Sequence, residues 1–262
     1  MTKIKCDSCK HEFEAERPKA VADMCFTDPP YGVSYKGTNN PNGRDWGVMN
    51  GDDLRKDDLF NFLLPIYKNI FKHTKDKAAL YSCYASSNHI IFENALMEAG
   101  FRVKQQLIWS KGHVLGHSDY HWCHEPILYC VKKDENSEWY GDRTHKTMLR
   151  DEKIDLKELN KEQLLEILTA IQEQSDVIEI QKDASQTYLH PTQKPVALSR
   201  GMIKNSSRPN ELVLEPCSGS GSTLMACETG NRTCYAMEIS PAFVDVAVKR
   251  WEDYTGQKGR RE

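Results

Sequence analysis

No apolar run in the 262-residue sequence approaches the length of a membrane span. Residues 1–5 lead into cysteine and charged side chains, without the apolar core of a signal peptide. The sequence therefore does not indicate membrane insertion or secretion, and we expect a cytoplasmic protein with no membrane partner. Its nine cysteines are scattered and odd in number, which favours reduced thiols over a disulfide framework.

A second Cys-x-x-Cys pair is also missing. The chain has one such pair, Cys6 and Cys9, followed by His11. Structural zinc sites take four ligands, usually as two pairs, so the sequence predicts no metal site. Cys6, Cys9 and His11 stay the candidate ligands, for a site whose fourth ligand comes from elsewhere in the chain or from another molecule.

The chain has no excess of positive charge, since its formal net charge is −3. This argues against a general polyanion binder, although charge can be segregated. Residues 150–183 hold ten acidic side chains against five Lys and Arg, which leaves a net +2 for the rest of the chain. We therefore expect any DNA-facing surface to lie outside that acidic stretch. Within it, residues 156–174 carry the apolar pattern of an amphipathic helix.

Strand-like and helix-like segments alternate along the first half of the chain. Strands are predicted at residues 21–26, 78–84 and 101–109, and helices at residues 53–73 and 88–99. This alternation is typical of a layered α/β sheet. The length favours one large α/β domain with an insertion over two equal domains.

One strand ends abruptly at Asp28-Pro29-Pro30-Tyr31. Two prolines cannot continue a strand, so the chain leaves the sheet at the edge where open α/β sheets bind ligands. The Asp28 carboxylate and the Pro29 carbonyl form an acceptor pair for the hydrogens of an aromatic amine, and Tyr31 offers a flat face for stacking. The alternative is a strand end of purely structural origin.

A second unit of strand, turn, helix and strand covers residues 211–239. Its turn contains Gly219 and Gly221, which let backbone approach a ligand closely, and the following helix N-terminus favours a carboxylate. Glu238, after the second strand, is placed to accept two ribose hydroxyls. Leu224 stands where dinucleotide enzymes have a third glycine, which argues against a pyrophosphate.

Three stretches together resemble a known family. They are Asp-Pro-Pro-Tyr at 28–31, His-Pro-Thr-Gln-Lys-Pro at 190–195 and Glu-Pro-Cys-Ser-Gly-Ser-Gly-Ser at 215–222. In this order they are similar to the motifs of permuted beta-group DNA amino-methyltransferases, over roughly residues 20–255. The resemblance implies a Rossmann-like S-adenosylmethionine-dependent methyltransferase sheet, circularly permuted, with a helical insertion.

The resemblance also implies roles for individual residues. Asp28, Pro29, Pro30 and Tyr31 would be catalytic and would act on a base flipped out of duplex DNA. The cofactor S-adenosylmethionine would be held by His190, Thr192, Lys194, Glu215, Cys217, Gly219, Gly221, Ser222 and Glu238. Two departures from the family pattern are Glu215, where Asp is usual, and the doubtful edge strand before Asp7.

The resemblance further divides the chain into parts. It implies an N-terminal cysteine-containing segment (1–19), a methyltransferase domain (20–255) and a tail (256–262). Within the domain, residues 111–189 would form the variable, target-recognition region with the helical insertion. The insertion could read the target, support a homodimer or pack on the sheet, and a cognate restriction endonuclease is a further expected partner.

We therefore predict a site-specific DNA methyltransferase that modifies adenine N6, because the catalytic motif begins with Asp. Cytosine-N4 methylation and methylation of RNA or another planar amine are the alternatives within the same chemistry. An alternative of another class is a non-catalytic DNA-binding or regulatory protein with a zinc-ribbon-like N-terminus.

Overall fold

The computed structural model describes residues 2–5, 12–15, 21–35, 50–110, 119, 122, 124–141, 177–179 and 194–260. Several sequence predictions lie outside this part of the chain. They are the candidate zinc ligands Cys6, Cys9 and His11, the helix at 156–174, and the cofactor residues His190 and Thr192.

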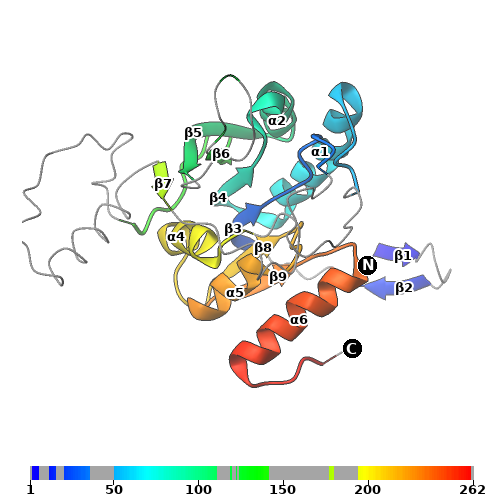
Figure 1. Cartoon of the computed structure of the whole chain (residues 1–262), viewed down its shortest axis with the longest axis vertical. Coiled ribbons are helices and arrows are strands. Elements are labelled where there is room, and N and C mark those ends of the chain that lie inside the picture. The colour runs from blue at the N-terminus through cyan, green and yellow to red at the C-terminus, as the bar shows by residue number, and fades with distance from the viewer. Residues whose placement is uncertain are drawn as a thin grey trace, which may run out of the picture.

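A seven-stranded sheet forms the centre of the molecule, with the strand order β7-β5-β6-β4-β3-β8-β9 (Figure 1). Its strands are β3 (Ala22–Thr27), β4 (Thr74–Cys83), β5 (Phe101–Ser110), β6 (His124–Lys132), β7 (Val177–Glu179), β8 (Leu212–Glu215) and β9 (Thr233–Ala236). Strand β6 runs antiparallel to both of its neighbours, and the other pairings in this sheet are parallel. The predicted layered α/β sheet is confirmed.

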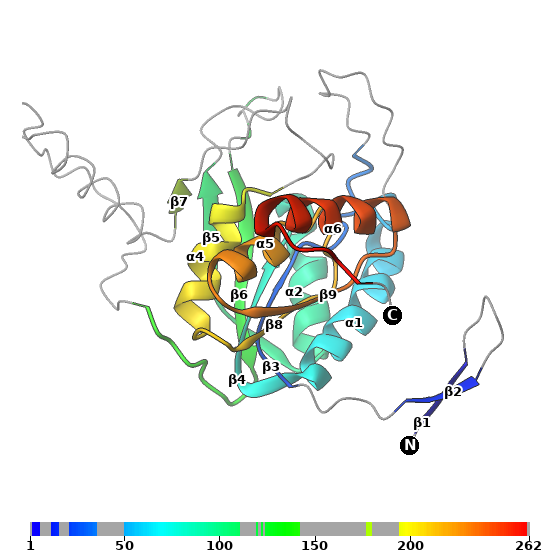
Figure 2. The ribbon, with the colours of Figure 1, turned by 90° about the horizontal axis from the view of Figure 1, so that it is seen from below.

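Helices cover both faces of the sheet (Figure 2). One face carries α1 (Lys56–His73) and α2 (His89–Glu98), and the other carries α4 (Val196–Ser206) and α5 (Ser222–Thr229). Alternate residues of β3 point to opposite faces, so Met24 packs in the core under α4 and α5 while Cys25 packs in the core under α1 and α2. A strand buried on both faces explains the continuous apolar run before Asp28.

Strand β8 pairs directly with β3, through Met24 with Val213 and Cys25 with Leu214. The two strands run parallel, so their carboxyl ends meet at the same edge of the sheet. The strand before Asp28 and the strand before the glycine turn are far apart in sequence and adjacent in space. This adjacency is what the circularly permuted arrangement requires.

The N-terminal strands form a sheet of their own. Strand β1 (Thr2–Lys5) pairs antiparallel with β2 (Glu12–Ala15). The sequence had raised the possibility that the strand before Asp7 is an edge strand of the main sheet, and this was wrong. The physical reason is that the hydrogen bonds of β1 go to its neighbour in sequence, β2, and form a local hairpin.

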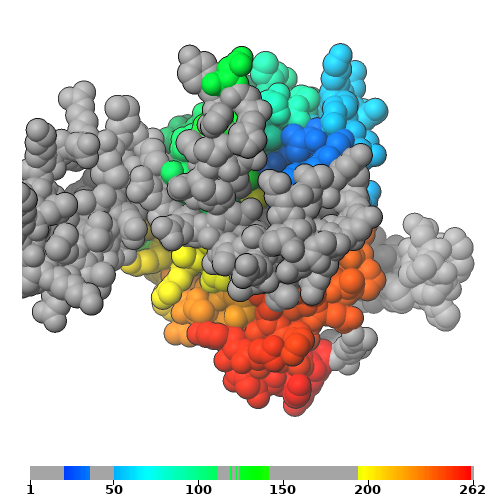
Figure 3. Space-filling model, in the orientation of Figure 1, coloured from blue at the N-terminus to red at the C-terminus, as the bar shows by residue number. Residues whose placement is uncertain are grey.

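Some element boundaries differ from those predicted. Helix α1 begins at Lys56, later than residue 53, and β9 ends at Ala236, short of residue 239, where the predicted unit ends. Helix α6 (Pro241–Thr255) was not predicted, and it lies at the surface (Figure 3). Ala247 is the buried residue of this helix. None of the helices in the described part of the chain is both long and apolar enough to cross a membrane.

Candidate active site

The Pro-Pro corner is fixed by a buried carboxylate from the next segment of the chain. Asp52, 1% exposed, accepts hydrogen bonds from the backbone amides of Tyr31 and Gly32, both at 3.0 Å, and of Tyr35 at 2.6 Å. Gly32 has a φ of +71°, and a Cβ there would lie 2.8 Å from the carbonyl oxygen of Leu54. The chain can therefore turn sharply after Tyr31 and hold that turn.

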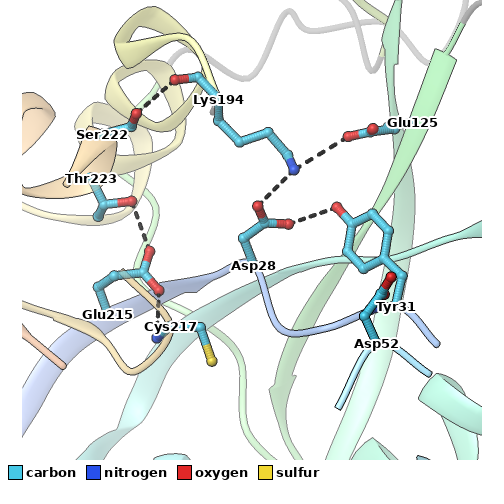
Figure 4. A network of polar contacts seen from close by, with 9 residues as sticks. All are labelled: Asp28, Tyr31, Asp52, Glu125, Lys194, Glu215, Cys217, Ser222 and Thr223. Atoms are coloured by element: carbon cyan, nitrogen blue, oxygen red, sulfur yellow. Dashed lines mark hydrogen bonds and ion pairs between the residues drawn. The ribbon is translucent and has the colours of Figure 1, made fainter. Parts of the chain in front are cut away.

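Asp28 stands at this corner with a partner on each carboxylate oxygen (Figure 4). The Tyr31 hydroxyl donates to Oδ1 at 2.6 Å, and the Lys194 ammonium donates to Oδ2 at 2.6 Å. The Asp28 side chain is 19% exposed, so it is mostly shielded from water. Both contacts fix the direction of the carboxylate before any substrate arrives.

The Tyr31 ring is held by contacts on several sides. It packs edge-to-face with Phe92, with the ring centroids 6.4 Å apart, and the Lys194 ammonium lies 5.2 Å from the Tyr31 centroid. The Asn88 amide donates to the Tyr31 carbonyl at 2.7 Å. Burial, and then the charge of Asp28, raises the pKa of the Tyr31 hydroxyl well above its usual value. Tyr31 therefore stays protonated and acts as a hydrogen-bond donor.

Lys194 is 7% exposed and reaches two carboxylates. Besides Asp28, its ammonium lies 3.4 Å from Oε2 of Glu125, near the start of β6. Burial alone would lower the pKa of Lys194, but the charges of Asp28 and Glu125 more than reverse this, and the pKa lies above its usual value. The sequence had assigned Lys194 to the cofactor; the structure places its charged end on Asp28.

The glycine turn is organised by the buried Glu215 at the end of β8. Its carboxylate accepts the Thr223 hydroxyl at 2.8 Å and the Cys217 backbone amide at 3.1 Å. Burial raises the pKa of the Glu215 carboxyl well above its usual value, and it also raises the pKa of the Cys217 thiol to about 12. Glu215 thus links the two ends of the turn through its hydrogen bonds to Cys217 and Thr223, and the Cys217 thiol stays protonated near neutral pH.

Glu238 joins the turn to the chain beyond β9. Its two oxygens accept the backbone amides of Gly219 at 2.7 Å and of Ser240 at 2.9 Å. Gly221, with a φ of +80°, leads into α5, where the Ser222 hydroxyl donates to the Lys194 carbonyl at 2.7 Å. The glycine turn and the Asp28 corner are therefore connected through Lys194.

The turn also keeps a polar group for a ligand. Ser218 Oγ is buried and lacks a hydrogen-bond partner among the described residues. Together with the glycine turn, the start of α5 and the Glu238 carboxylate, it fits a ligand that carries both a carboxylate and hydroxyls. In the described part of the chain, no group of three or more His, Cys, Asp or Glu side chains could hold a metal ion.

The structure thus brings Asp28 and Tyr31 together with Lys194, Glu215 and the glycine turn. Two residues of this site were not predicted. Glu125 stands just before the apolar run at 127–131, which is a weak signal for a polar partner at the sheet edge. Asp52 follows Gly51 in a loop and gives no signal in the sequence, because its partners are backbone amides 17 to 21 residues away.

A mixed sheet in which only β6 is antiparallel among the described strands, with a Pro-Pro corner and a glycine turn on one rim, defines a Rossmann-like methyltransferase. The sequence model of the N6/N4 DNA methylases, described as "DNA methylase", matches residues 22–249. The chain belongs to this DNA methylase family, whose members use S-adenosylmethionine. The family and fold predicted from the sequence are confirmed.

Two characterised relatives match most of this chain. Type II methyltransferase M.HinfI of Haemophilus influenzae is 28% identical over 244 residues, which cover 89% of this chain and 64% of M.HinfI. DNA adenine methyltransferase YhdJ of Escherichia coli is 26% identical over 240 residues, which cover 89% of this chain and 77% of YhdJ. The chain therefore spans just under two thirds of the length of M.HinfI.

Solved structures show the same fold. The M1.HpyAVI–SAM complex superimposes with a TM-score of 0.57 at 22% identity, covering 88% of this chain and 90% of that one. The cytosine-N4-specific PvuII DNA methyltransferase superimposes with a TM-score of 0.64 at 15% identity, covering 90% and 81%. At these identities the superpositions support the sheet and its helices.

Proposed function

We propose that this protein transfers a methyl group from S-adenosylmethionine to N6 of adenine at a specific sequence in duplex DNA. The observation that carries this function is the pairing of β3 with β8, which sets Asp28 beside the glycine turn. Family membership and the DNA adenine methyltransferase YhdJ among the relatives support the same activity.

Asp28 and the Pro29 carbonyl are the proposed acceptors for the two hydrogens of the target amine. The lone pair of an aromatic amine is delocalised into the ring, and two aimed acceptors favour the pyramidal nitrogen that can attack. Tyr31 gives a flat surface for a base extruded from the duplex. Pro30 fixes the path of the chain between these groups.

The cofactor, when bound, supplies a methyl group on a sulfonium centre. We assign its binding to Glu215, Cys217, Gly219, Gly221, Ser222 and Glu238, with His190 and Thr192 from the sequence motif. Of these, Gly219 and Ser222 lie at the turn and the helix start, which suits a carboxylate. Glu238 keeps acceptor capacity for ribose hydroxyls, because a carboxylate oxygen accepts more than one hydrogen bond.

The amine must lose one proton when its nitrogen gains the methyl group. Lys194 cannot take it, because the neighbouring carboxylates keep its ammonium charged. The nearest group that can take it is the Asp28 carboxylate, from which the proton passes to water. The step is a direct displacement, without a covalent link to the protein.

The methyltransferase domain is assigned to residues 20–255. Within it, residues 111–189 are assigned to recognition of the target sequence, because neither the Asp28 corner nor the glycine turn carries groups that distinguish one duplex sequence from another. Residues 1–19 and 256–262 are left as an N-terminal segment and a tail. A homodimer, a cognate restriction endonuclease and a cytoplasmic location stay predictions of the sequence.

The test is expression in a host without adenine methylation, followed by sequencing of its DNA for modified bases. We expect N6-methyladenine at one short sequence, and none with Asp28→Ala. Asp53→Ala, at an exposed position in the same region, is the matched control and should leave the modification in place. Methylation that survives Asp28→Ala would remove the mechanism, and modified cytosine in place of adenine would move the assignment to N4.

A further inference from the structure

Lys194 occupies the position on Asp28 that the target amine needs. Its Nζ lies 2.6 Å from Oδ2, while Oδ1 already accepts the Tyr31 hydroxyl at 2.6 Å. Both oxygens of the proposed amine acceptor are thus engaged within the protein itself. A base that brings its amine to Asp28 must share Oδ2 with Lys194 or displace the ammonium.

A second acceptor for the ammonium stands close by. Oε2 of Glu125 lies 3.4 Å from Lys194 Nζ, farther than Asp28 but within reach of a small rotation about the lysine side chain (Figure 4). The side chains of Asp28, Glu125 and Lys194 are 19%, 21% and 8% exposed, so water competes weakly for these contacts. Two carboxylates therefore share one cation in a shielded site.

The backbone of Lys194 is held by contacts that do not involve its charged end. Its carbonyl accepts the Ser222 hydroxyl at 2.7 Å, and Pro195 follows it at the start of α4. Removal of the ammonium would leave two partly buried carboxylates facing each other, an arrangement that is strongly destabilising for the charged form. The lysine therefore fixes the direction of the Asp28 carboxylate and separates it from Glu125.

We propose that Lys194 is a positioning residue that holds the Asp28 carboxylate in a fixed direction, and that Glu125 receives its ammonium when the target amine takes its place on Asp28. This inference rests on the proposed function and deepens it, since it names how the acceptor is kept ready and then released. No proton, electron or covalent bond is exchanged in this shift. It is a change of ion-pair partner that costs little, because the cation keeps a carboxylate throughout.

The test measures three quantities for each variant: the single-turnover rate of methyl transfer, the dissociation constant of S-adenosylmethionine and the thermal midpoint. Lys194→Met should lower the single-turnover rate by about 100-fold, the loss typical of a preorganised charge, and change the cofactor constant by less than about threefold. Lys194→Arg keeps the charge, and its single-turnover rate should be at least about tenfold higher than that of Lys194→Met.

Lys132→Met is the matched control. Lys132 is also 7% exposed and ion-paired, but its partners are Asp76 and the Thr74 carbonyl, at the amino end of β4. Lys132→Met should lower the thermal midpoint and leave the single-turnover rate within about threefold of the wild type, because the buried cation that it removes lies away from Asp28. A rate loss as large as that of Lys194→Met would mark a general effect of destabilisation and overturn the proposal.

Glu125→Gln tests the second acceptor. It should slow single turnover by about tenfold and leave cofactor binding unchanged, because a neutral amide receives the ammonium less well. The double variant Lys194→Met/Glu125→Gln should be no slower than Lys194→Met, since without the ammonium Glu125 has nothing to receive. Fully additive losses would remove the role of Glu125.

Other results separate this inference from the proposed function. A wild-type protein that methylates no DNA contradicts the function itself. An active wild type with an equally active Lys194→Met, or with a variant that loses cofactor affinity alone, contradicts only the role given to Lys194. If Lys194→Met does not fold, Glu125→Gln decides: a rate about tenfold below the wild type supports the proposal, and a rate within threefold of the wild type would overturn it.

Discussion

Asp28 and Lys194 are 166 positions apart in the chain, and their charged atoms lie 2.6 Å apart in the structure. One belongs to the Pro-Pro corner after β3 and the other to the segment before α4. The contact joins the proposed catalytic motif to a motif that the sequence had assigned to the cofactor. It follows that substitutions on either side of the site should affect the other.

Substitution of Asp52 should destabilise the Pro-Pro corner. Asp52→Ala leaves the backbone amides of Tyr31, Gly32 and Tyr35 without their acceptor, and we expect a loss of about 3 kcal/mol in the free energy of unfolding. Urea denaturation measures it. The exposed neighbour Asp53→Ala should stay within about 0.5 kcal/mol of the wild type. Equal losses for the two variants would contradict this account of the corner.

Removal of the Tyr31 hydroxyl should slow catalysis without disrupting packing. Tyr31→Phe keeps the ring on Phe92 but loses the hydrogen bond to Asp28, so we expect kcat to fall about tenfold. Tyr84→Phe is the control, because Tyr84 packs on the same Phe92 and its hydroxyl contacts His89. A steady-state assay in which both variants lose the same activity would show that the hydroxyl of Tyr31 has no special role.

The left-handed glycines give a matched pair of variants. Gly221→Ala places a Cβ 2.8 Å from the Ala247 Cβ at a φ of +80°, whereas Gly256→Ala, at +70°, meets no atom within 4 Å. Both should lose about 1 kcal/mol to backbone strain, and Gly221→Ala should lose about 1–3 kcal/mol more from the clash. Gly221→Ala should also weaken cofactor binding in a calorimetric titration. Equal free energies of unfolding for the two variants would mean that α6 shifts to relieve the contact with Ala247 at no cost in stability.

The buried carboxyl of Glu215 should make stability depend on pH. Burial raises its pKa in the native state above the unfolded value, so its proton stabilises the fold below about pH 4.3, and this contribution is lost as the pH rises through the native pKa. The advantage of the wild type over Glu215→Gln should therefore shrink between pH 5 and pH 8, by at most about 1.4 kcal/mol per pH unit.

Urea denaturation of both proteins across this pH range gives the measurement. Gln105→Ala, at an exposed residue without a titratable group, should give a difference from the wild type that is flat over the same range. A difference for Glu215→Gln that grows as the pH rises would mean that the carboxyl is held ionised by Thr223 and Cys217, and would reverse the sign of the prediction.

The sequence alone determined the alternation of strands and helices, because apolar periodicity follows directly from burial on one face or two. It also placed Asp28 and Gly219 at strand ends, since Pro-Pro and Gly-Ser-Gly stop a strand wherever it lies. Family motifs then related these two segments to each other. Local chemistry of this kind does not depend on which strands become neighbours.

Only the tertiary structure decided what the charged side chains touch. The family resemblance implied a cofactor role for Lys194, and the structure shows its ammonium on Asp28, because a long lysine side chain reaches a partly buried carboxylate on a neighbouring segment. Glu125 and Asp52 became part of the site because β6 and the segment before α1 pass close to the Asp28 corner. Contacts between segments far apart in the chain depend on strand order, and strand order is a property of the whole sheet.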